Sequence, residues 1–175
     1  MPHRSTTELE SGLDEIRRSP KNDGRLEMIV RRPVKGQREI LHEGQLTLEE
    51  GLAGDCWKDH SPHPDMQINI MNSRAIDLVA GNKDRWALAG DQLFIDMDLS
   101  EANVPPGTQL ELGSALIEIT AAPHTGCSKF AARFGFDAVK FVNSAVGRNL
   151  HLRGLNARVI RPGLIRAGDA VRKKI

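Results

Sequence analysis

Short apolar segments recur along this chain, and glycine or proline separates most of them from the next. Some alternate residue by residue, as 66–70 does, which is typical of a strand with one buried face. The expected strands are 26–30, 39–46, 66–70, 93–97, 108–112, 115–120, 149–153, 157–160 and 170–172. Many short strands at close intervals favour a barrel or sandwich over a doubly wound fold. We therefore predict a mainly β, barrel-like fold with a few short helices.

Two segments have the spacing of helices instead. Ser73 is placed to cap a helix that ends at Gly81, because serine accepts hydrogen bonds at a helix start and glycine adopts the conformation that ends one. Asp137 is placed in the same way to cap a helix that ends at Gly147. The apolar residues of this second helix lie on one face, so we expect them in the core.

Composition indicates one ordinary globular domain. The chain has 175 residues, of which 39% are hydrophobic and 27% charged, enough to build a single core. Residues 1–24 are polar and are interpreted as a loosely attached N-terminal arm, and 25–175 as one domain. No segment resembles a signal peptide and nowhere do roughly 18 apolar residues follow one another, so a cytoplasmic protein without a membrane segment is expected.

The loop 123–130, which contains Cys127, is the most reactive-looking stretch of the sequence. It lies between the predicted strand 115–120 and a segment with helical spacing. Unpaired N–H groups at a helix start, together with positive charge from His124 and Lys129, favour a thiolate at Cys127. A thiolate can attack, carry sulfur or ligate a metal. The alternative is that this cysteine only fills space in an apolar core, as free cysteines often do.

Charge is distributed unevenly along the chain. Residues 124–175 contain 11 lysines and arginines but only two acidic residues, whereas residues 1–123 contain 13 basic and 21 acidic ones. The excess of positive charge predicts an anionic ligand bound by the C-terminal part. The alternative is that the two parts neutralise each other across the folded surface.

A metal site in the middle of the chain also has to be considered. Asp55, Cys56, His60, His63 and Asp65 are ligand-type residues close together in sequence. Their spacing matches no standard zinc pattern, and the two cysteines of the whole chain, Cys56 and Cys127, provide neither a disulfide framework nor a four-cysteine site. The sequence therefore disfavours zinc.

Two functions of other classes remain as alternatives. The basic C-terminal part is compatible with a nucleic-acid-binding module, but seven aromatic residues and no stacking motif argue against it. A cysteine hydrolase would need His124 or His151 as the base that activates Cys127. His124 is only three residues from Cys127 along the chain, which constrains its orientation.

The order of several short motifs resembles the MOSC domain, which is found at the C-terminus of molybdenum cofactor sulfurases and in small stand-alone proteins. The resemblance covers about residues 26–173. It rests on Gly-Leu-Ala-Gly-Asp at 51–55, Gly-Asp-Gln-Leu at 90–93, Pro-Pro-Gly-Thr at 105–108, Pro-His-Thr-Gly-Cys at 123–127, Leu-Arg-Gly at 152–154 and Gly-Asp at 168–169.

The resemblance implies a strand-rich barrel with its site at Cys127, which would carry sulfur as a persulfide or ligate molybdenum, with His124 beside it. The cofactor would be the molybdenum cofactor, whose molybdopterin bears a phosphate. The candidate residues to hold it are Lys129, Arg133, Arg148, Arg153, Thr125 and Ser128. Only Arg153 among these basic residues lies in a stretch that matches the family pattern.

The same resemblance predicts a dependence on other proteins. The chain lacks the aminotransferase-like domain of the full sulfurases, so no pyridoxal phosphate site is expected in it. A sulfur-donating or electron-donating protein, or a molybdoenzyme acceptor, is the expected partner. A molybdenum-dependent reductase of N-hydroxylated compounds is the alternative within the family. A noncatalytic cofactor carrier is an alternative of another class.

Overall fold

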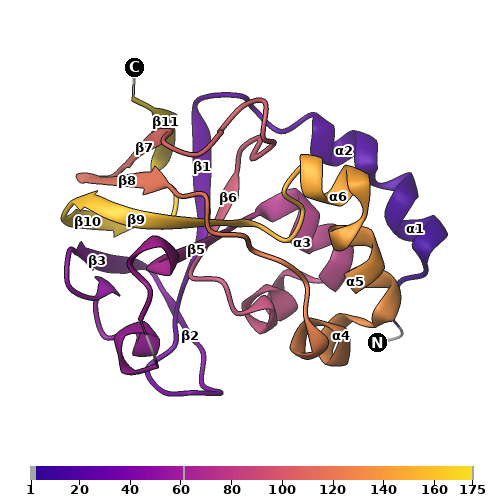
Figure 1. The fold of residues 1–175 in the computed structure, drawn as a ribbon, viewed down its shortest axis with the longest axis horizontal. Coiled ribbons are helices and arrows are strands. Elements are labelled where there is room, and N and C mark those ends of the chain that lie inside the picture. The colour runs from indigo at the N-terminus through magenta and orange to yellow at the C-terminus, as the bar shows by residue number, and fades with distance from the viewer. Residues whose placement is uncertain (1–2, 61, 175) are drawn as a thin grey trace.

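A closed β-barrel organises the molecule (Figure 1). The structure, a computed structural model, describes residues 3–60 and 62–174, and within them seven strands form a ring in the order β1-β11-β7-β8-β9-β5-β6, with β6 pairing again with β1. The ring strands are β1 (Gly24–Arg31), β5 (Ile68–Asn72), β6 (Leu93–Asp96), β7 (Gln109–Leu112), β8 (Ala115–Ile119), β9 (Leu155–Arg161) and β11 (Ala170–Lys173). Only β5 and β6 run parallel; the other neighbours in this ring are antiparallel. The predicted mainly β, barrel-like fold is confirmed.

Four further strands of the described residues lie outside this ring. β2 (Glu39–Leu41) pairs with the end of β1 in an antiparallel arrangement. A separate sheet has the order β10-β3-β4, formed by β10 (Gly163–Arg166), β3 (Glu43–Thr47) and β4 (Gly51–Leu52). Sequence analysis predicted neither β4 nor β10.

The helices gather on one side of the barrel (Figure 1). They are α1 (Thr6–Ser11), α2 (Leu13–Arg17), α3 (Ser73–Ala80), α4 (Ser128–Phe134), α5 (Phe136–Asn143) and α6 (Ala145–Asn149). Three short 3-10 helices lie in the described connections: η1 (Cys56–Asp59), η2 (Pro64–Met66) and η3 (Lys83–Ala89). Among residues 3–60 and 62–174, none of the helices has both the length and the apolar composition needed to cross a membrane.

Strand alternation gives the molecule two hydrophobic cores. In β6, Leu93 and Ile95 belong to the core inside the barrel, and Phe94 between them belongs to the core under the helices. Successive side chains of a strand point to opposite faces, so a strand that is apolar throughout can serve both cores. On the helix side, Phe94 joins Phe130 and Phe134 of α4. β6 therefore contributes to the interior of the barrel with one face and to the packing of α4 with the other.

The two predicted helices exist, but their ends differ from the prediction. Asn72, not Ser73, caps α3, and its side chain accepts a hydrogen bond from the Ala75 N–H. Asp137 does not cap α5, because the chain enters this helix through Gly135 and the Asp137 carboxylate accepts a hydrogen bond from the Thr6 N–H instead.

The segment after α5 also differs. Gly147 does not end a helix but lies inside α6, where an added Cβ would approach the Phe141 carbonyl oxygen to 2.3 Å. A glycine is needed there because α6 packs directly on the backbone of α5. The predicted strand 149–153 is wrong, since these residues form the end of α6 and a turn in which His151 has a φ of 48°.

The N-terminal segment is more firmly attached than its polar composition indicated. α1 and α2 direct Leu9 and Ile16 into the core under the helices, and Leu9 is fully buried. The hydrogen bond from Thr6 to Asp137 fixes the start of α1 to α5. This segment therefore covers the same helical layer that contains α4.

Candidate functional site

The loop from β8 to α4 is held in place by two asparagine side chains. Asn156 donates hydrogen bonds to the carbonyl oxygens of Ala122 and Pro123, at 3.0 and 3.2 Å. Asn143 accepts from the Gly126 N–H at 2.9 Å and donates back to the Gly126 carbonyl at 3.0 Å. Because a loop of this kind has no strand partner, these four bonds satisfy backbone groups that would otherwise need water. They also fix the position of the next residue, Cys127.

Cys127 is the residue immediately before α4 and its side chain is exposed. The nearby backbone N–H of Phe130 lowers the pKa of its thiol most; burial opposes this, and the Lys129 N–H and the charges of Arg153 and Lys129 lower the pKa further. No side-chain capping hydrogen bond of normal geometry forms here, so the N–H groups act through their partial charges. Of the predicted contributors, the N–H groups at the start of α4 and Lys129 act on the Cys127 thiol; His124 does not, and Arg153 acts in its place.

A buried carboxylate lies behind this loop. Asp91 is fully buried, and its two oxygens contact His124 Nε2 at 2.9 Å and an Arg153 guanidinium nitrogen at 2.7 Å. Arg153 also donates to the Ala89 carbonyl at 3.1 Å and lies over the ring of Phe130, 4.9 Å from its centre. Arg153 thereby links the carboxylate to the helix that begins at Cys127.

This arrangement keeps the carboxylate ionised. Burial alone would raise the pKa of Asp91, but the charges of Arg153 and His124, and hydrogen bonds from both, outweigh it and lower the pKa to about 2. A buried ion pair with good hydrogen bonds costs much to break from one side, because the remaining charge loses its partner. Asp91 therefore anchors both Arg153 and His124.

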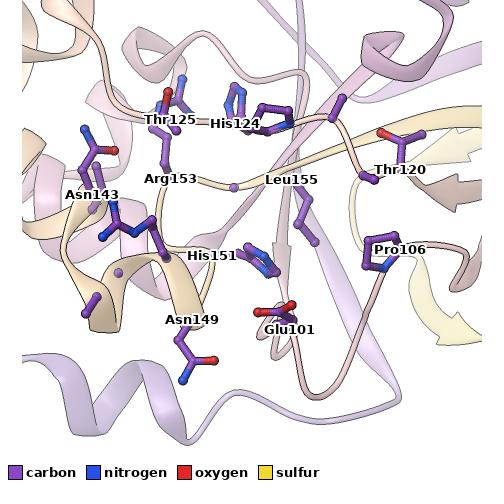
Figure 2. A pocket seen from close by; sticks show the side chains of 18 residues that line it. Glu101, Pro106, Thr120, His124, Thr125, Asn143, Asn149, His151, Arg153 and Leu155 are labelled. Carbon is purple, nitrogen blue, oxygen red and sulfur yellow. The ribbon is translucent and has the colours of Figure 1, made fainter.

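A cleft of about 550 Å³, which we call the large cleft, opens beside the loop (Figure 2). Its lining includes His124 and Thr125 from the loop, Val142 and Asn143 from α5, and Leu155 from β9. The other lining residues are Glu101, Pro106, Thr120, Ala121, Ala122, Pro123, Ala145, Gly147, Arg148, Asn149, His151, Arg153 and Gly154. Cys127 does not line this cleft.

A smaller cleft of about 300 Å³, which we call the basic cleft, contains three closely spaced cations, Arg32, Lys35 and Arg38. Its other lining residues are Gly36, Cys56, Trp57, His60, His63, Met66 and Asn69. Asp55 neutralises Arg32 through a double contact, at 2.7 and 2.9 Å. Burial, followed by the charges of Arg133 and Arg32, lowers the pKa of Arg38. The Arg38 guanidinium donates to the carbonyl oxygens of Ala87 and Gln37, at 3.2 and 2.7 Å, but forms no salt bridge with a carboxylate of the described residues.

A chain of side-chain hydrogen bonds connects the basic cleft to the cysteine loop. Arg32 contacts the side-chain oxygen of Asn69 at 3.4 Å, and the Asn69 amide donates to Asn156 at 2.6 Å. Asn156 in turn holds the carbonyl oxygens of Ala122 and Pro123. Side-chain hydrogen bonds thus link Arg32 in the basic cleft to the loop before Cys127.

The predicted site residues do not all meet at one place. His124, Thr125, Arg148 and Arg153 line the large cleft, although Arg153 uses its outer nitrogens on Asp91 and Ala89. Ser128 and Lys129 are exposed at the start of α4, beside Cys127. Arg133, at the other end of α4, donates to the Leu88 carbonyl and contributes its charge near Arg38 of the basic cleft.

Sequence reasoning missed several residues that build the site. Asp91, Asn143 and Asn156 orient the loop and its cations, and Arg32 and Arg38 form the basic cleft. A signal existed for Asp91, since it belongs to the Gly-Asp-Gln-Leu motif at 90–93. The distant asparagines and arginines gave none, because only folding brings them to the loop.

The described residues show no arrangement in which His124 or His151 could act as a base toward Cys127. They also show no arrangement that could hold zinc. His124 directs Nε2 at Asp91, and no hydrogen bond joins it to Cys127 within 3–60 and 62–174. In the same ranges no group of three or more histidine, cysteine, aspartate or glutamate side chains is placed to hold a metal ion. Asp55, one of the zinc candidates, is paired with Arg32 instead.

The barrel, the anchored loop and Cys127 define a β-barrel protein with an exposed cysteine at a strand-to-helix junction. The sequence model of the MOSC domain matches residues 57–172 of this chain. The chain therefore belongs to the MOSC domain family, and the resemblance noted from its motifs is confirmed. No curated protein sequence matches it significantly.

Solved structures share this fold at low sequence identity. The YuaD protein from Bacillus subtilis is 14% identical with a TM-score of 0.62, and the match covers 85% of this chain and 93% of that one. YiiM from Escherichia coli is 23% identical with a TM-score of 0.57, covering 86% and 70%. YiiM from Geobacillus stearothermophilus is 16% identical with a TM-score of 0.59, covering 87% and 75%. At these identities the likeness establishes the barrel fold alone.

Proposed function

We propose that this MOSC protein carries sulfur on Cys127 and binds the molybdenum cofactor through the basic cleft. The observation that carries the proposal is the state of Cys127, an exposed thiol with a lowered pKa on an anchored loop. A thiol that served only as core packing would be buried and would have no source of positive potential around it. Exposure also suits a group that must be reached by another protein.

The sulfur-carrying step is a thiol exchange. The Cys127 thiolate attacks the terminal sulfur of a persulfide on a sulfur-donating protein, a new S–S bond forms at Cys127, and the donor leaves as its own thiolate. One sulfur atom moves and no net oxidation occurs. Positive charge from Lys129 and Arg153 stabilises both the attacking thiolate and the persulfide anion that it becomes.

The residues of the basic cleft fit a ligand that bears a phosphate. Arg32, Lys35 and Arg38 line it, and Arg38 forms no salt bridge with a carboxylate of the described residues. Guanidinium groups bind phosphate through paired hydrogen bonds, and lysine adds a point charge. These residues would hold the phosphate of molybdopterin. Of the phosphate-binding residues expected from sequence, Arg133 is the one whose charge acts beside this cleft.

The molybdenum cofactor supplies oxygen-atom and electron transfer at its metal when bound. The residues of this chain bind and orient it, and a soft thiolate such as Cys127 is also a suitable ligand for such a metal. Ligation by Cys127 is therefore the second candidate, and the reductase of N-hydroxylated compounds belongs to it. A molybdoenzyme acceptor or an electron donor completes the function in either case.

The test compares the protein with its Cys127→Ala variant, both produced in a host that makes the molybdenum cofactor. Intact mass reports a persulfide as the addition of one sulfur atom, removed by a reducing agent, and elemental analysis reports molybdenum. We expect the added sulfur in the native protein and its loss in Cys127→Ala. Molybdenum that depends on Cys127 without added sulfur would favour ligation instead.

Cys56 provides the matched control. It is the only other cysteine in the sequence, and it is buried beside the basic cleft. Cys56→Ala should keep the added sulfur. Folded protein that carries neither sulfur nor molybdenum, with or without Cys127, would contradict the proposed function.

A further inference from the structure

The large cleft contains two opposite charges that the protein does not pair. Glu101 and Arg148 both line it and both are exposed. Within residues 3–60 and 62–174, neither side chain makes a salt bridge or a hydrogen bond. The Glu101 N–H donates to the carbonyl of Asn149, the neighbour of Arg148, at 3.0 Å. The chain segments that carry Glu101 and Arg148 are therefore joined by a backbone hydrogen bond at the cleft.

His151 adds a hydrogen-bond acceptor to the same part of the cleft. Its Nδ1 is 2.7 Å from the Leu99 carbonyl oxygen, and because a carbonyl only accepts, Nδ1 carries the hydrogen. Neutral His151 then has a free lone pair on Nε2. The two contacts, Glu101 to Asn149 and His151 to Leu99, join the segments 99–101 and 149–151, and Figure 2 shows Glu101, Asn149 and His151 in this part of the lining.

The backbone of His151 has an unusual conformation, which fixes the position of its ring. Its φ of 48° lies in the left-handed region, which costs a non-glycine residue roughly 1–2 kcal/mol. Such a conformation persists only where the surrounding structure enforces it, and it is concentrated at binding sites. The bond to Leu99 and the turn before Gly154 hold the ring of His151 at the cleft.

The remaining wall of the large cleft is largely apolar. Pro106, Pro123, Val142 and Leu155 line it together with several alanines. A ligand that satisfies the whole cleft thus needs a positive group, a negative group and an apolar part. A volume of about 550 Å³ is the size of a small-molecule site.

We propose that the large cleft binds an α-amino acid with an apolar side chain, whose ammonium group contacts Glu101 and His151 and whose carboxylate contacts Arg148. The apolar side chain lies against Val142 and Leu155. This site is separate from the basic cleft and goes beyond sulfur carriage, because none of its residues is Cys127. It gives the protein a second ligand, recognised through both charges at once.

Calorimetric titration with three related probes tests the proposal at neutral pH. L-leucine has both charges, N-acetyl-L-leucine lacks the ammonium, and L-leucinamide lacks the carboxylate. We expect L-leucine to bind about tenfold tighter than either blocked form, because each blocked form loses one charge-assisted hydrogen bond, equivalent to about 1.4 kcal/mol. Glu101→Gln should remove the preference over N-acetyl-L-leucine, and Arg148→Gln the preference over L-leucinamide.

Two control variants separate this site from other parts of the molecule. Glu49→Gln alters an exposed acid outside the cleft and should leave all three affinities unchanged. Cys127→Ala should also leave them unchanged, so that failure of sulfur carriage and failure of this site are distinguishable. No saturable binding of L-leucine, or equal affinity for the three probes, would overturn the proposal.

Discussion

Arg153 and Asp91 form a buried ion pair, 2.7 Å between nitrogen and oxygen, behind the loop that carries Cys127. The other oxygen of Asp91 binds His124, so a single carboxylate positions two residues of the site. The Arg153 guanidinium also lies over the Phe130 ring on α4, and its positive charge lowers the pKa of Cys127. Stability of the fold and the state of the thiol are therefore expected to depend on the same carboxylate.

Asp91→Asn should destabilise the protein strongly. The substitution leaves the buried Arg153 without its counter-charge, and breaking a buried pair from one side costs about 3–5 kcal/mol. Urea unfolding followed by circular dichroism measures this loss. Asp96→Asn is the control, because Asp96 pairs with Arg74 near the surface and its removal should cost about 1 kcal/mol or less. Equal losses in the two variants would contradict the anchoring role of Asp91.

Acid should remove the contribution of Asp91. Its pKa is lowered from 3.8 to about 2, so ionised Asp91 stabilises the fold at every pH above about 4. The contribution, about 2 kcal/mol, is lost as the pH falls from 4 through 2. Unfolding free energies measured across this interval should therefore fall less in Asp91→Asn than in the native protein. Parallel curves would show that Asp91 has an ordinary pKa.

Alkylation of Cys127 should become half-maximal at a lower pH than for a free cysteine, whose pKa is about 8.5. The direction follows from the N–H groups at the start of α4 and the charges of Arg153 and Lys129. Lys129→Met removes one of these charges and should shift the midpoint upward. Mass spectrometry after timed reaction with iodoacetamide distinguishes Cys127 from the buried Cys56, which should react slowly. A midpoint unaffected by Lys129 would contradict this account.

The barrel was predictable because its signal is local. Alternation of apolar and polar residues, as in β7, and the turn residues between strands are read directly from neighbouring positions. The failures lie where tertiary contacts override local preference. Asp137 has a good capping side chain but bonds to Thr6 from the N-terminal segment, and Gly147 serves a close helix contact rather than a helix end.

The site was only partly predictable for the same reason. Cys127 stood out because small, polar and basic neighbours surround it in sequence. Asn156, Asn143 and the arginines of the basic cleft lie far from it along the chain, and nothing in a single sequence connects them. The excess of positive charge in residues 124–175 predicted an anionic ligand there, yet Arg32 and Arg38, which line the basic cleft, lie outside that part.

Arg38→Gln should weaken the binding of phosphate-bearing ligands to the basic cleft. Titration with inorganic pyrophosphate measures this, and we expect about a tenfold loss, equivalent to one charge-assisted hydrogen bond of about 1.4 kcal/mol. Affinity of the native protein should fall as salt is added, because salt screens the cations. Arg17→Gln, on the exposed face of α2, is the control and should bind normally. If Arg38→Gln bound pyrophosphate as tightly as the native protein, the proposal that the basic cleft binds the phosphate would be wrong.

A substitution at Gly154 tests how closely β5 of the barrel packs against the cysteine loop. The φ of Gly154 is 109°, and an added Cβ would lie 2.2 Å from the Ile70 carbonyl oxygen of β5 and 3.2 Å from the His124 ring. Gly107 also has a positive φ, 90°, but an added Cβ there meets nothing within 4 Å. Alanine at either position incurs the backbone cost of roughly 1–2 kcal/mol.

The difference between the two variants isolates the steric contact. Gly154→Ala should lose about 1–3 kcal/mol more than Gly107→Ala in urea unfolding, the usual cost of forcing atoms into a packed region. Because His124 lies against this position and shares Asp91 with Arg153, we also expect Gly154→Ala to raise the alkylation midpoint of Cys127. Gly107→Ala should leave that midpoint unchanged. Similar stability losses in the two variants, with no change in the alkylation midpoint of Cys127, would contradict this account. They would mean that β5 and the cysteine loop can move apart without cost, and that Asp91 alone positions His124 and Arg153.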